Sequence, residues 1–503
     1  MKSDEQFKRL RMHNFIGGKL TKSASKDEVP VIEPATEAVI GASADATDNE
    51  IDQAVELANK AQREWRKRDA STRAENLHKA AQRLRERGPV IAELMTREMG
   101  KPYKEAMDEM EWGASALEYY AELARNDRGR VLGPNVEGQF HFTVKEPLGA
   151  IAVILPFNYP ITLLCWEAAA ALATGNTVIV KPHEFCPTTT LAFMECTDHM
   201  PAGVFQCLTG GGRVGARLVA HADIKGVAYT GNIPIGQQVA QECAKTFKRA
   251  LIETSGHDPF IIMPSAPMDV TVDAALFSAF MNCGQICVST ERFYVHESIH
   301  DEFVEKLVAK AKKLRIGNGL ERVDMGPMAA ERERNRFEAI IQGFKDQGAV
   351  IESGGKRPDG LGKGWFYEPT VLTSVNDDMP VMKKESFGPV APVCKVASFE
   401  EALQRANDSD FGLGANLYST DLTEVFEAVS EIEAGMLWVN APLLDNDAGP
   451  FGGTKLSGDG RQLGQEGLDQ FRKNKMVMID PRCEHQNFWW FPYQDEESFK
   501  PGQ

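Results

Sequence analysis

The sequence predicts an α/β fold in which helices cover both faces of largely parallel sheets, and three observations support this prediction. A short apolar run at residues 150–155 is typical of a buried parallel strand. Strand-like and helix-like segments then alternate from residue 177 to residue 220, as in a doubly wound sheet. A second α/β series occupies residues 255–470, and a chain of 503 residues is too long for one core, so length alone predicts roughly three domains.

The predicted elements follow in a regular order. Residues 50–126 should be helical, because apolar residues recur at spacings of three and four, as at Ile51, Val55 and Ala58. The Gly-rich segment 129–147 should be extended, and a helix should follow Pro160. The later alternation is predicted as strand 177–180, helix 188–199, strand 204–208 and helix 214–220.

The composition is that of a globular protein and narrows the choice of partner. Hydrophobic residues make up 43% of the chain and charged residues 25%. The 56 basic and 72 acidic residues give a net charge of -16, which argues against a nucleic acid or an anionic membrane as partner. The first residues lack the apolar core of a signal peptide, and stretches such as 168–173 are too short to span a bilayer, so we expect a cytoplasmic protein.

Cys287 is the strongest candidate for a reactive residue. A thiolate adds readily to a carbonyl carbon, and a carboxylate such as Glu253, if folding brings it near, can activate water against the resulting thioester. Such a pair suits the oxidation of an aldehyde. A single cysteine is more often a packing residue, so the surrounding sequence must decide. The nine cysteines lack zinc-site spacing, and we expect reduced thiols and no metal.

Six short segments place Cys287 and Glu253 in a wider pattern. They are Pro156-Phe157-Asn158-Tyr159-Pro160, Lys181-Pro182-His183-Glu184, Glu253-Thr254-Ser255-Gly256, Gly284-Gln285-Ile286-Cys287, Glu385-Ser386-Phe387-Gly388-Pro389-Val390, and Pro450-Phe451-Gly452-Gly453 through Ser457-Gly458. In order and spacing the chain resembles the aldehyde dehydrogenase superfamily from about residue 13 to residue 480. It is similar to the NAD(P)-dependent hydrolytic members, because relatives that transfer the acyl group to coenzyme A lack the carboxylate of Glu253.

The resemblance implies a three-domain aldehyde dehydrogenase-like fold, with two doubly wound α/β domains and a small β oligomerisation element. The implied ranges are 1–127 and 147–253 for the NAD-binding domain, 254–473 for the catalytic domain, 128–146 and 474–490 for the oligomerisation element, and 491–503 for a C-terminal tail. A homodimer or homotetramer is expected. The aromatic run at residues 488–493 extends past the family core, and we expect it to dock on another subunit in preference to acting as a free binding motif.

Three segments argue for a dinucleotide cofactor. Residues 210–215 match the Gly-rich phosphate-binding pattern, although a turn that only joins strand to helix explains them equally well. Similar family members bind ribose hydroxyls with residues that match Lys181 and Glu184, and Glu184 should repel a 2′-phosphate, so NAD is favoured over NADP. In the third segment, Asn232 stands where the family usually has Ser. The predicted cofactor residues are Pro156, Phe157, Lys181, Glu184, Gly215, Thr230, Gly231, Asn232, Glu385 and Phe387.

The resemblance also implies roles for the reacting groups. Cys287 should attack the aldehyde, while Asn158 and the backbone amide of Cys287 stabilise the oxyanion. Hydride transfer to the nicotinamide leaves a thioester, against which Glu253 should activate water. Glu385 should accept the nicotinamide ribose hydroxyls, and Phe387 should pack beside the ring.

The substrate is the least determined part of the prediction. Tyr159, Leu163 and Trp166 are spaced to share one helical face directly after Asn158. In relatives this face lines the aldehyde tunnel, and the predicted pocket is Trp112, Tyr159, Leu163, Trp166, Glu167, Met281, Ile286, Val288, Asp445 and Phe451. Acidic Glu167 and Asp445, with Asp447, depart from the usual family residues and suit a cationic, amino-type aldehyde. The alternative, in which these acids face solvent or pair with local basic residues, leaves a neutral aldehyde or a semialdehyde as substrate.

Two other functions stay open at the level of sequence. One is a noncatalytic structural relative that has kept the fold, and the other is a hydrolase that cleaves esters through Cys287 without a cofactor. The presence of Asn158, Glu253, Cys287 and Glu385 together favours the oxidoreductase. Formation of NADH from NAD and an aldehyde distinguishes all three.

Overall fold

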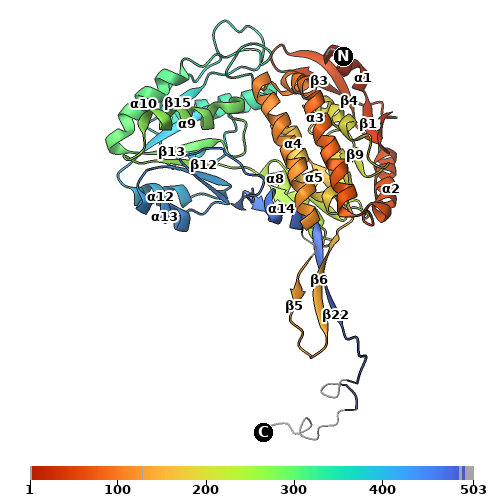
Figure 1. Cartoon of the computed structure of the whole chain (residues 1–503). Coiled ribbons are helices and arrows are strands. Elements are labelled where there is room, and N and C mark those ends of the chain that lie inside the picture. Colours follow the sequence, from red (N-terminus) through yellow and green to blue (C-terminus); the bar gives the residue numbers. More distant parts are fainter. Residues whose placement is uncertain (1–2, 127–128, 486–489, 493–503) are drawn as a thin grey trace, which may run out of the picture.

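The chain folds into two lobes that lie side by side, with an arm that projects from one of them (Figure 1). The computed structural model describes residues 3–126, 129–485 and 490–492. An eight-stranded sheet forms the centre of the lobe that carries the N-terminus, and a seven-stranded sheet forms the centre of the other lobe.

The first sheet is of the dinucleotide-binding type. Its strands, in spatial order, are β2 (Lys19–Lys22), β1 (His13–Ile16), β9 (Phe205–Cys207), β8 (Thr177–Lys181), β7 (Ala150–Ile154), β10 (Gly226–Thr230), β11 (Arg249–Glu253) and β21 (Gly458–Asp459). The five strands from β9 to β11 are mutually parallel. Their order reverses between β7 and β10, and α/β proteins bind ligands at such a point, beyond the carboxyl ends of the strands.

Alternate residues of β7 face two different cores, as expected for a strand that is covered on both sides. Ala150 and Ala152 belong to one core, and Ile151 and Val153 belong to the other. The first core is supplied by α2 (Asp48–Trp65), α7 (Gly212–Ala220) and α8 (Ile233–Ala244), and the second by α3 (Ala70–Met99), α4 (Tyr103–Asn126), α5 (Pro160–Ala173) and α6 (Pro187–Met194).

The second sheet has the same layered plan. Its strands, in spatial order, are β14 (Val350–Ser353), β15 (Thr370–Thr373), β16 (Val390–Val396), β13 (Thr290–His296), β12 (Asp258–Ile262), β18 (Gly414–Tyr418) and β19 (Met436–Val439). All neighbours are parallel except β14 and β15. The accompanying helices are α9 (Met268–Phe280), α10 (Glu297–Ala311), α11 (Glu331–Asp346), α12 (Phe399–Asn407) and α13 (Leu422–Glu431).

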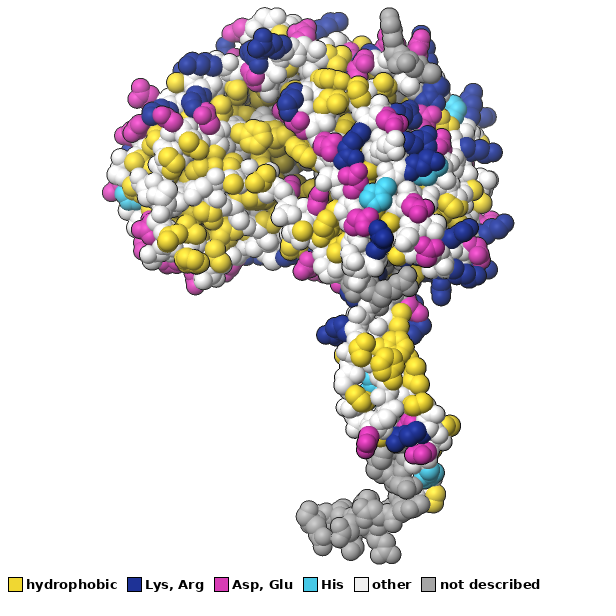
Figure 2. All heavy atoms as spheres, in the orientation of Figure 1, with side chains coloured by type: hydrophobic (Ala, Val, Ile, Leu, Met, Phe, Trp, Pro, Cys, Tyr) yellow, Lys and Arg dark blue, Asp and Glu magenta, His cyan; other side chains and the backbone are white. Residues whose placement is uncertain are grey.

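The arm is a three-stranded antiparallel sheet of β5 (Val131–Leu132), β6 (Phe140–Pro147) and β22 (Arg472–Ile479). It stands away from both lobes (Figure 1), and hydrophobic side chains are visible along it (Figure 2). The exposed apolar residues of the arm are Val131, Phe140, Met476, Met478 and Ile479. A sheet that exposes this much apolar surface is typical of an interface.

The remaining elements are short. They are α1 (Ser3–Leu10), β3 (Glu28–Glu33), β4 (Ala38–Ala44), η1 (Glu195–Thr197), η2 (Met281–Gly284), η3 (Pro380–Lys383), β17 (Phe411–Gly412), β20 (Thr454–Lys455) and α14 (Gly464–Gln470).

The predicted alternation of strands and helices is confirmed, with one shortened element. The helix predicted at 188–199 ends at Met194 and continues only as the 3-10 turn η1. The predicted domain boundaries stay predictions. Strand β21 lies within the range predicted for the catalytic domain, yet it pairs with β11 in the first sheet.

Part of the aromatic C-terminal run falls within the described residues. Trp490 and Phe491 are exposed, and the Trp490 ring contacts His485. Phe488, Trp489 and Tyr493 lie outside the described residues. Among the helices that are described, none is both long enough and apolar enough to cross a membrane.

Candidate active site

The predicted site residues converge where the strand order of the first sheet reverses. Pro156, Phe157 and Asn158 directly follow β7, while Thr230 ends β10 and Glu253 ends β11. A cavity of 810 Å³ opens at these strand ends. It is lined by all ten predicted cofactor residues and also by Asn158 and Cys287.

The loop that carries Cys287 has an unusual backbone. Asn282, Cys283 and Gly284 have φ values of 50°, 57° and 70°, in the left-handed region that L-residues seldom adopt. Glycine is required at the third position, because a Cβ on Gly284 would lie 2.2 Å from the carbonyl oxygen of Gly388. Such strain persists only where the surrounding structure holds it, and it is often found at functional sites.

Buried polar groups hold this loop in place. The Asn282 amide nitrogen donates to Glu105, and its side chain donates to the carbonyl oxygens of Asn158 and Gln285. The Gln285 side chain in turn accepts from the Ala329 amide. The loop is therefore tied to the segment that carries Asn158, which fixes the nucleophile relative to the predicted oxyanion donor.

Cys287 differs from most other cysteines of the chain. Seven of the nine are buried, whereas Cys287 is partly exposed in the cavity and Cys483 lies on the surface. Burial of the sulfur and the neighbouring carboxyl of Glu253 raise the pKa of the Cys287 thiol well above its usual value. The thiol is therefore favoured over the thiolate, and it must lose its proton before the sulfur can attack.

Glu253 is close enough to act on a group that is bound to the sulfur. The turn that follows it approaches the cysteine so tightly that a Cβ on Gly256 would lie 1.9 Å from the Cys287 carbonyl oxygen. The Glu253 side chain is 2% exposed, and burial raises its pKa to about 7. A carboxyl with this pKa exchanges protons readily near neutral pH, as a general base must.

Asn158 is supported by a buried ion pair that was not predicted from the sequence. The Lys101 ammonium donates to the Asn158 carbonyl oxygen at 2.8 Å and pairs with Glu109, and both side chains are fully buried. Glu109 also accepts from the amides of Ile161 and Thr162 in the first turn of α5. The pair therefore fixes the segment between β7 and α5, which is the segment that presents Asn158.

The Gly-rich pattern at residues 210–215 does not present a free phosphate-binding turn. The carboxylate of Asp45 accepts from the Gly211 amide at 2.9 Å and pairs with Arg213. A side chain of the protein therefore occupies the place that an anion would take at the start of α7, and only Gly212 and Gly215 of the pattern line the cavity. At the next helix, Asn232 caps α8 by accepting from the Ile235 amide at 3.1 Å.

The predicted ribose site has a more balanced charge than the sequence indicated. The ammonium of Lys181 lies 4.0 Å from the carboxylate of Glu184, and Arg332 lies 3.3 Å from the same carboxylate. Arg332 also stacks 4.5 Å from the Phe185 ring. Two cations thus flank Glu184, so its repulsion of a 2′-phosphate is weaker than for an isolated carboxylate.

Glu385 and Phe387 are held over the cavity by another buried carboxyl. Glu291 accepts from the amides of Ser386 and Phe387, at 2.6 and 2.8 Å. The Phe387 ring meets the Phe157 ring edge to face, with centroids 5.9 Å apart. Glu385 accepts from the Gly256 amide at 3.3 Å, so it lies beside the turn that carries Glu253.

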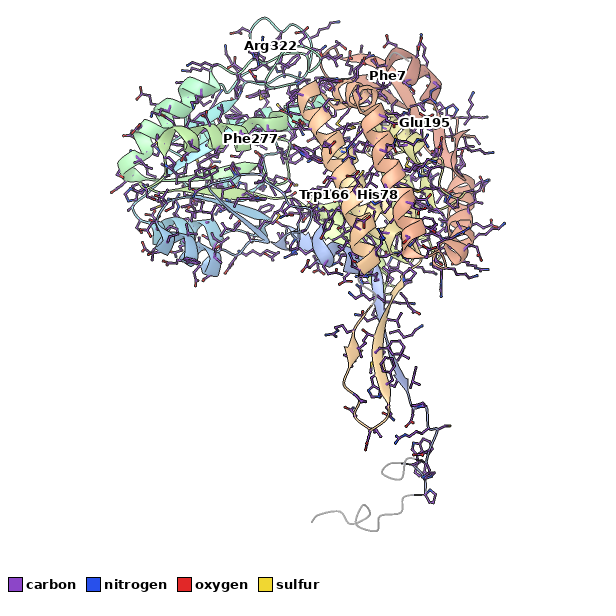
Figure 3. The ribbon with its side chains drawn as sticks, in the orientation of Figure 1. Phe7, His78, Trp166, Glu195, Phe277 and Arg322 are labelled. Atoms are coloured by element: carbon purple, nitrogen blue, oxygen red, sulfur yellow. The ribbon has the colours of Figure 1, made fainter. Side chains whose placement is uncertain are left out.

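Seven of the ten residues predicted for the substrate pocket belong to the large apolar core of the first lobe, against which Cys287 packs. They are Tyr159, Leu163, Trp166, Met281, Ile286, Val288 and Phe451. The rings of Trp166 and Phe451 have centroids 5.0 Å apart, and Trp112 contacts Tyr159 at 6.3 Å. Figure 3 shows Trp166 near the junction of the two lobes. One face of the Tyr159 ring is occupied by Lys101, at 3.6 Å.

The three acids predicted near a cationic substrate have different surroundings. Glu167 is 0% exposed and accepts from Thr230 and Gln462, so the prediction that it holds the far end of a cation does not fit its position. Asp445 is exposed, yet desolvation by the surrounding protein and the charge of Asp447 raise its pKa to about 7. Asp447 accepts from the Ser115 hydroxyl. Among the described residues, no basic side chain pairs with either aspartate.

Comparison with known proteins identifies the family. The model of the aldehyde dehydrogenase family matches residues 20–477. The chain belongs to the aldehyde dehydrogenase family. It is 37% identical to the chloroplastic aminoaldehyde dehydrogenase of Arabidopsis thaliana, over 92% of this chain and 95% of the relative. It is 36% identical to the glutarate-semialdehyde dehydrogenase of Pseudomonas aeruginosa, over 94% of this chain and 98% of that one.

A solved structure gives the same result. Betaine aldehyde dehydrogenase of Staphylococcus aureus, in complex with NAD+, superposes with a TM-score of 0.93 and 32% identity, over 97% of this chain and 98% of that chain. The protein is therefore an aldehyde dehydrogenase, an enzyme that oxidises an aldehyde with NAD or NADP as hydride acceptor.

Several supporting residues of this aldehyde dehydrogenase gave no clear signal in the sequence. Lys101, Glu109, Asp45 and Glu291 are charged residues, which are usually solvated, and each acts through a partner far away in the chain. The one signal that the sequence offered was the position of Glu109 in its helix. Glu109 interrupts an otherwise apolar helical face between Ala106 and Gly113, and an acid on a buried face requires a partner.

Proposed function

We propose that Cys287 is the nucleophile of the oxidation and that Glu253 acts as base. The thiol releases its proton to water in the cavity, the sulfur bonds to the aldehyde carbon, and the carbonyl oxygen becomes an oxyanion. The side-chain amide of Asn158 and the backbone amide of Cys287 donate to this oxygen. The observation that carries the proposal is that Cys287 and Asn158 line one cavity and that the buried carboxyl of Glu253 neighbours the Cys287 thiol.

The second half of the reaction uses Glu253 as its base. Glu253 removes a proton from water, the resulting hydroxide adds to the thioester carbon, and the C–S bond breaks. The sulfur leaves as a thiolate that regains a proton from Glu253, and the carboxylic acid departs. Because Glu253 must be ionised to accept the proton from water, hydrolysis should be lost as the pH falls below about 7.

NAD fits the cavity and, when bound, supplies the acceptor for the hydride. Its ribose hydroxyls would be held by Lys181 and Glu184 at one end and by Glu385 at the other, with Phe387 beside the nicotinamide. The cavity is suited to a molecule with phosphates and riboses, because its lining includes both cations (Lys181, Arg332, Arg336) and carboxyls (Glu184, Glu385).

We expect NAD to be preferred over NADP by roughly tenfold to a hundredfold in kcat/KM, because like charges at Glu184 and a 2′-phosphate repel. Arg332 should limit this preference, since it offers a cation to the 2′-phosphate. Arg332→Ala should therefore widen the preference for NAD, and Glu184→Ser should narrow it. Steady-state kinetics with both cofactors check this. Equal efficiency of the wild type with the two cofactors would show that Glu184 turns away from the ribose.

The substrate that we propose is a small or medium aldehyde with a cationic far end, such as an amino, guanidino or quaternary ammonium aldehyde. Support comes from Asp445 and Asp447, which lack a basic partner among the described residues, and from the aromatic rings of Trp112, Tyr159 and Trp166. The aminoaldehyde and betaine aldehyde relatives agree with this choice. The glutarate-semialdehyde relative keeps an anionic aldehyde as the alternative.

Length-matched aldehydes that end in ammonium, methyl and carboxylate groups should separate these substrates. We expect the highest kcat/KM for the ammonium aldehyde, and its advantage should grow as the pH rises through about 7 because Asp445 becomes ionised. Asp445→Asn should lower kcat/KM for the ammonium aldehyde about tenfold and leave kcat/KM for the methyl aldehyde unchanged. Best activity on the carboxylate would mean that Asp445 and Asp447 point away from the substrate.

We also propose that the enzyme is a homo-oligomer in which the arm packs on a partner subunit. The exposed apolar residues of the arm support this, as does the edge strand β19 of the second sheet. Light scattering of the full chain distinguishes monomer, dimer and tetramer. A cytoplasmic location stays a prediction, and relatives include chloroplastic and peroxisomal enzymes.

A further inference from the structure

Glu253 belongs to a cluster of four buried side chains, of which the other three have no role in the steps above. They are Glu167 from α5, Thr230 at the end of β10, and Gln462 in the loop before α14. The Thr230 hydroxyl lies 2.9 Å from Glu167 Oε1 and 3.4 Å from Glu253 Oε2. The Gln462 amide donates to Glu167 at 2.7 Å and to Thr230 at 3.2 Å. A continuous hydrogen-bonded path therefore joins the two carboxyls.

The cluster cannot hold two negative charges at low cost. Glu167 Oε2 and Glu253 Oε1 are buried without a hydrogen-bond partner among the described residues. No lysine, arginine or histidine of the described chain forms an ion pair with either carboxyl. The titratable groups that face the pair are Tyr120 of α4, Cys287 and Asp445, and none of them supplies a positive charge. Burying two unpaired charges side by side is costly, so the pair retains a proton.

We propose that Glu167 and Glu253 titrate as one pair, linked through Thr230 and Gln462, and that Glu167 keeps the shared proton while Glu253 acts as base. The inference rests on the proposed function, because it takes Glu253 as the residue that activates water. Glu167 is then a positioning residue. It touches neither substrate nor cofactor, and it sets the ionisation of the group that does.

The surroundings favour Glu167 as the protonated partner. It is 0% exposed, whereas Glu253 adjoins the water-accessible cavity through Thr254. Burial, and to a smaller extent the charge of Glu253, raise the pKa of Glu167 to about 8, compared with about 7 for Glu253. A neutral Glu167 still accepts from Thr230 and Gln462 through Oε1. The proton then resides on Oε2, where it removes the charge from an oxygen that lacks a donor.

Coupling of this kind predicts two ionisations that belong to the pair. The first, near pH 7, leaves Glu253 charged beside a neutral Glu167. The second, near pH 8, charges Glu167 as well, which raises the proton affinity of Glu253 and strengthens it as a base. The rate of hydrolysis of the acyl-enzyme should therefore rise in two steps.

Glu167→Gln tests this directly, because glutamine keeps the oxygen that accepts from Thr230 and Gln462 but cannot lose a proton. In single-turnover experiments at a series of pH values, we expect the rate of acyl-enzyme hydrolysis in the variant to keep its rise near pH 7 and to lose its rise near pH 8. Steady-state kinetics should give an unchanged KM. Glu98→Gln is the matched control. Glu98 is an equally buried carboxyl that caps α6 by accepting from Thr188 and Thr189, and its variant should keep both steps. The proposal would be overturned if the hydrolysis rate of Glu167→Gln still rose with pH in two steps, or if that of the wild type rose in only one.

Infrared difference spectra provide a second measurement that does not depend on turnover. At pH 7.5 the wild type minus Glu167→Gln spectrum should contain a protonated carboxyl band. In Glu253→Gln that band should persist and titrate at lower pH, because the charge of Glu253 no longer opposes the ionisation of Glu167. Loss of the protonated carboxyl band in Glu253→Gln would assign the proton to Glu253 and would contradict the proposal. If Glu253→Gln still hydrolyses its acyl-enzyme, the proposed function fails instead, and the two failures are distinct.

Discussion

Cys287→Ala should lower the rate of aldehyde oxidation by on the order of 10³-fold or more, because the reaction loses its covalent route. The expectation rests on the position of Cys287 in the cavity, beside Glu253 and on a loop that Asn282 ties to Asn158. The alanine variant keeps the backbone amide at position 287 and the remaining cofactor residues. It should therefore bind NAD normally, which titration of protein fluorescence measures.

Cys283→Ala is the matched control for this experiment. Cys283 lies in the same left-handed loop, and its side chain is buried in the core of the second lobe rather than in the cavity. Its variant should lose some thermal stability, as other core truncations do, and retain turnover. Near-normal turnover in Cys287→Ala would falsify the assignment of the nucleophile and would favour a different thiol.

The sequence predicted much of this site because the family motifs lie at strand ends. Residues 156–158 follow β7, Thr230 ends β10 and Glu253 ends β11, so a correct alternation of strands and helices already brings them to one crevice. The pattern around Cys287 also determines chemistry, since Gly284 is required by close contact with Gly388. The family resemblance together with the strand and helix pattern therefore sufficed to predict that these residues lie close together.

The sequence was least informative about residues whose environment depends on distant segments. The Gly-rich pattern at 210–215 gave no indication that the Asp45 carboxylate would accept a hydrogen bond from the Gly211 amide. The charge of Glu167 was expected to act on a substrate, but its partners Thr230 and Gln462 come from two other parts of the chain. Sequence spacing on one helix places the side chain on a face, and it does not show which groups the other elements bring to that face.

Glu253→Gln should stop the reaction after the first half. We expect a burst of NADH that approaches one equivalent per site, followed by a stall, because the glutamine amide cannot take a proton from water and the thioester on Cys287 persists. Intact-protein mass spectrometry after mixing with NAD and aldehyde should detect the acyl adduct. The Glu98→Gln variant, which replaces a remote buried carboxyl, should turn over without accumulating it.

The same variant shows whether Glu253 also serves the first half of the reaction. The charge of Glu253 contributes to the raised pKa of Cys287, so its removal should lower that pKa and accelerate alkylation of the thiol near neutral pH. If Glu253 is instead needed to remove the thiol proton, Glu253→Gln should form NADH slowly from the start, and the burst should disappear. A clear burst with faster alkylation would mean that the thiolate forms without Glu253, and that this carboxyl is essential only for the attack of water. Absence of both burst and adduct, with slower alkylation, would place Glu253 in the step that generates the nucleophile.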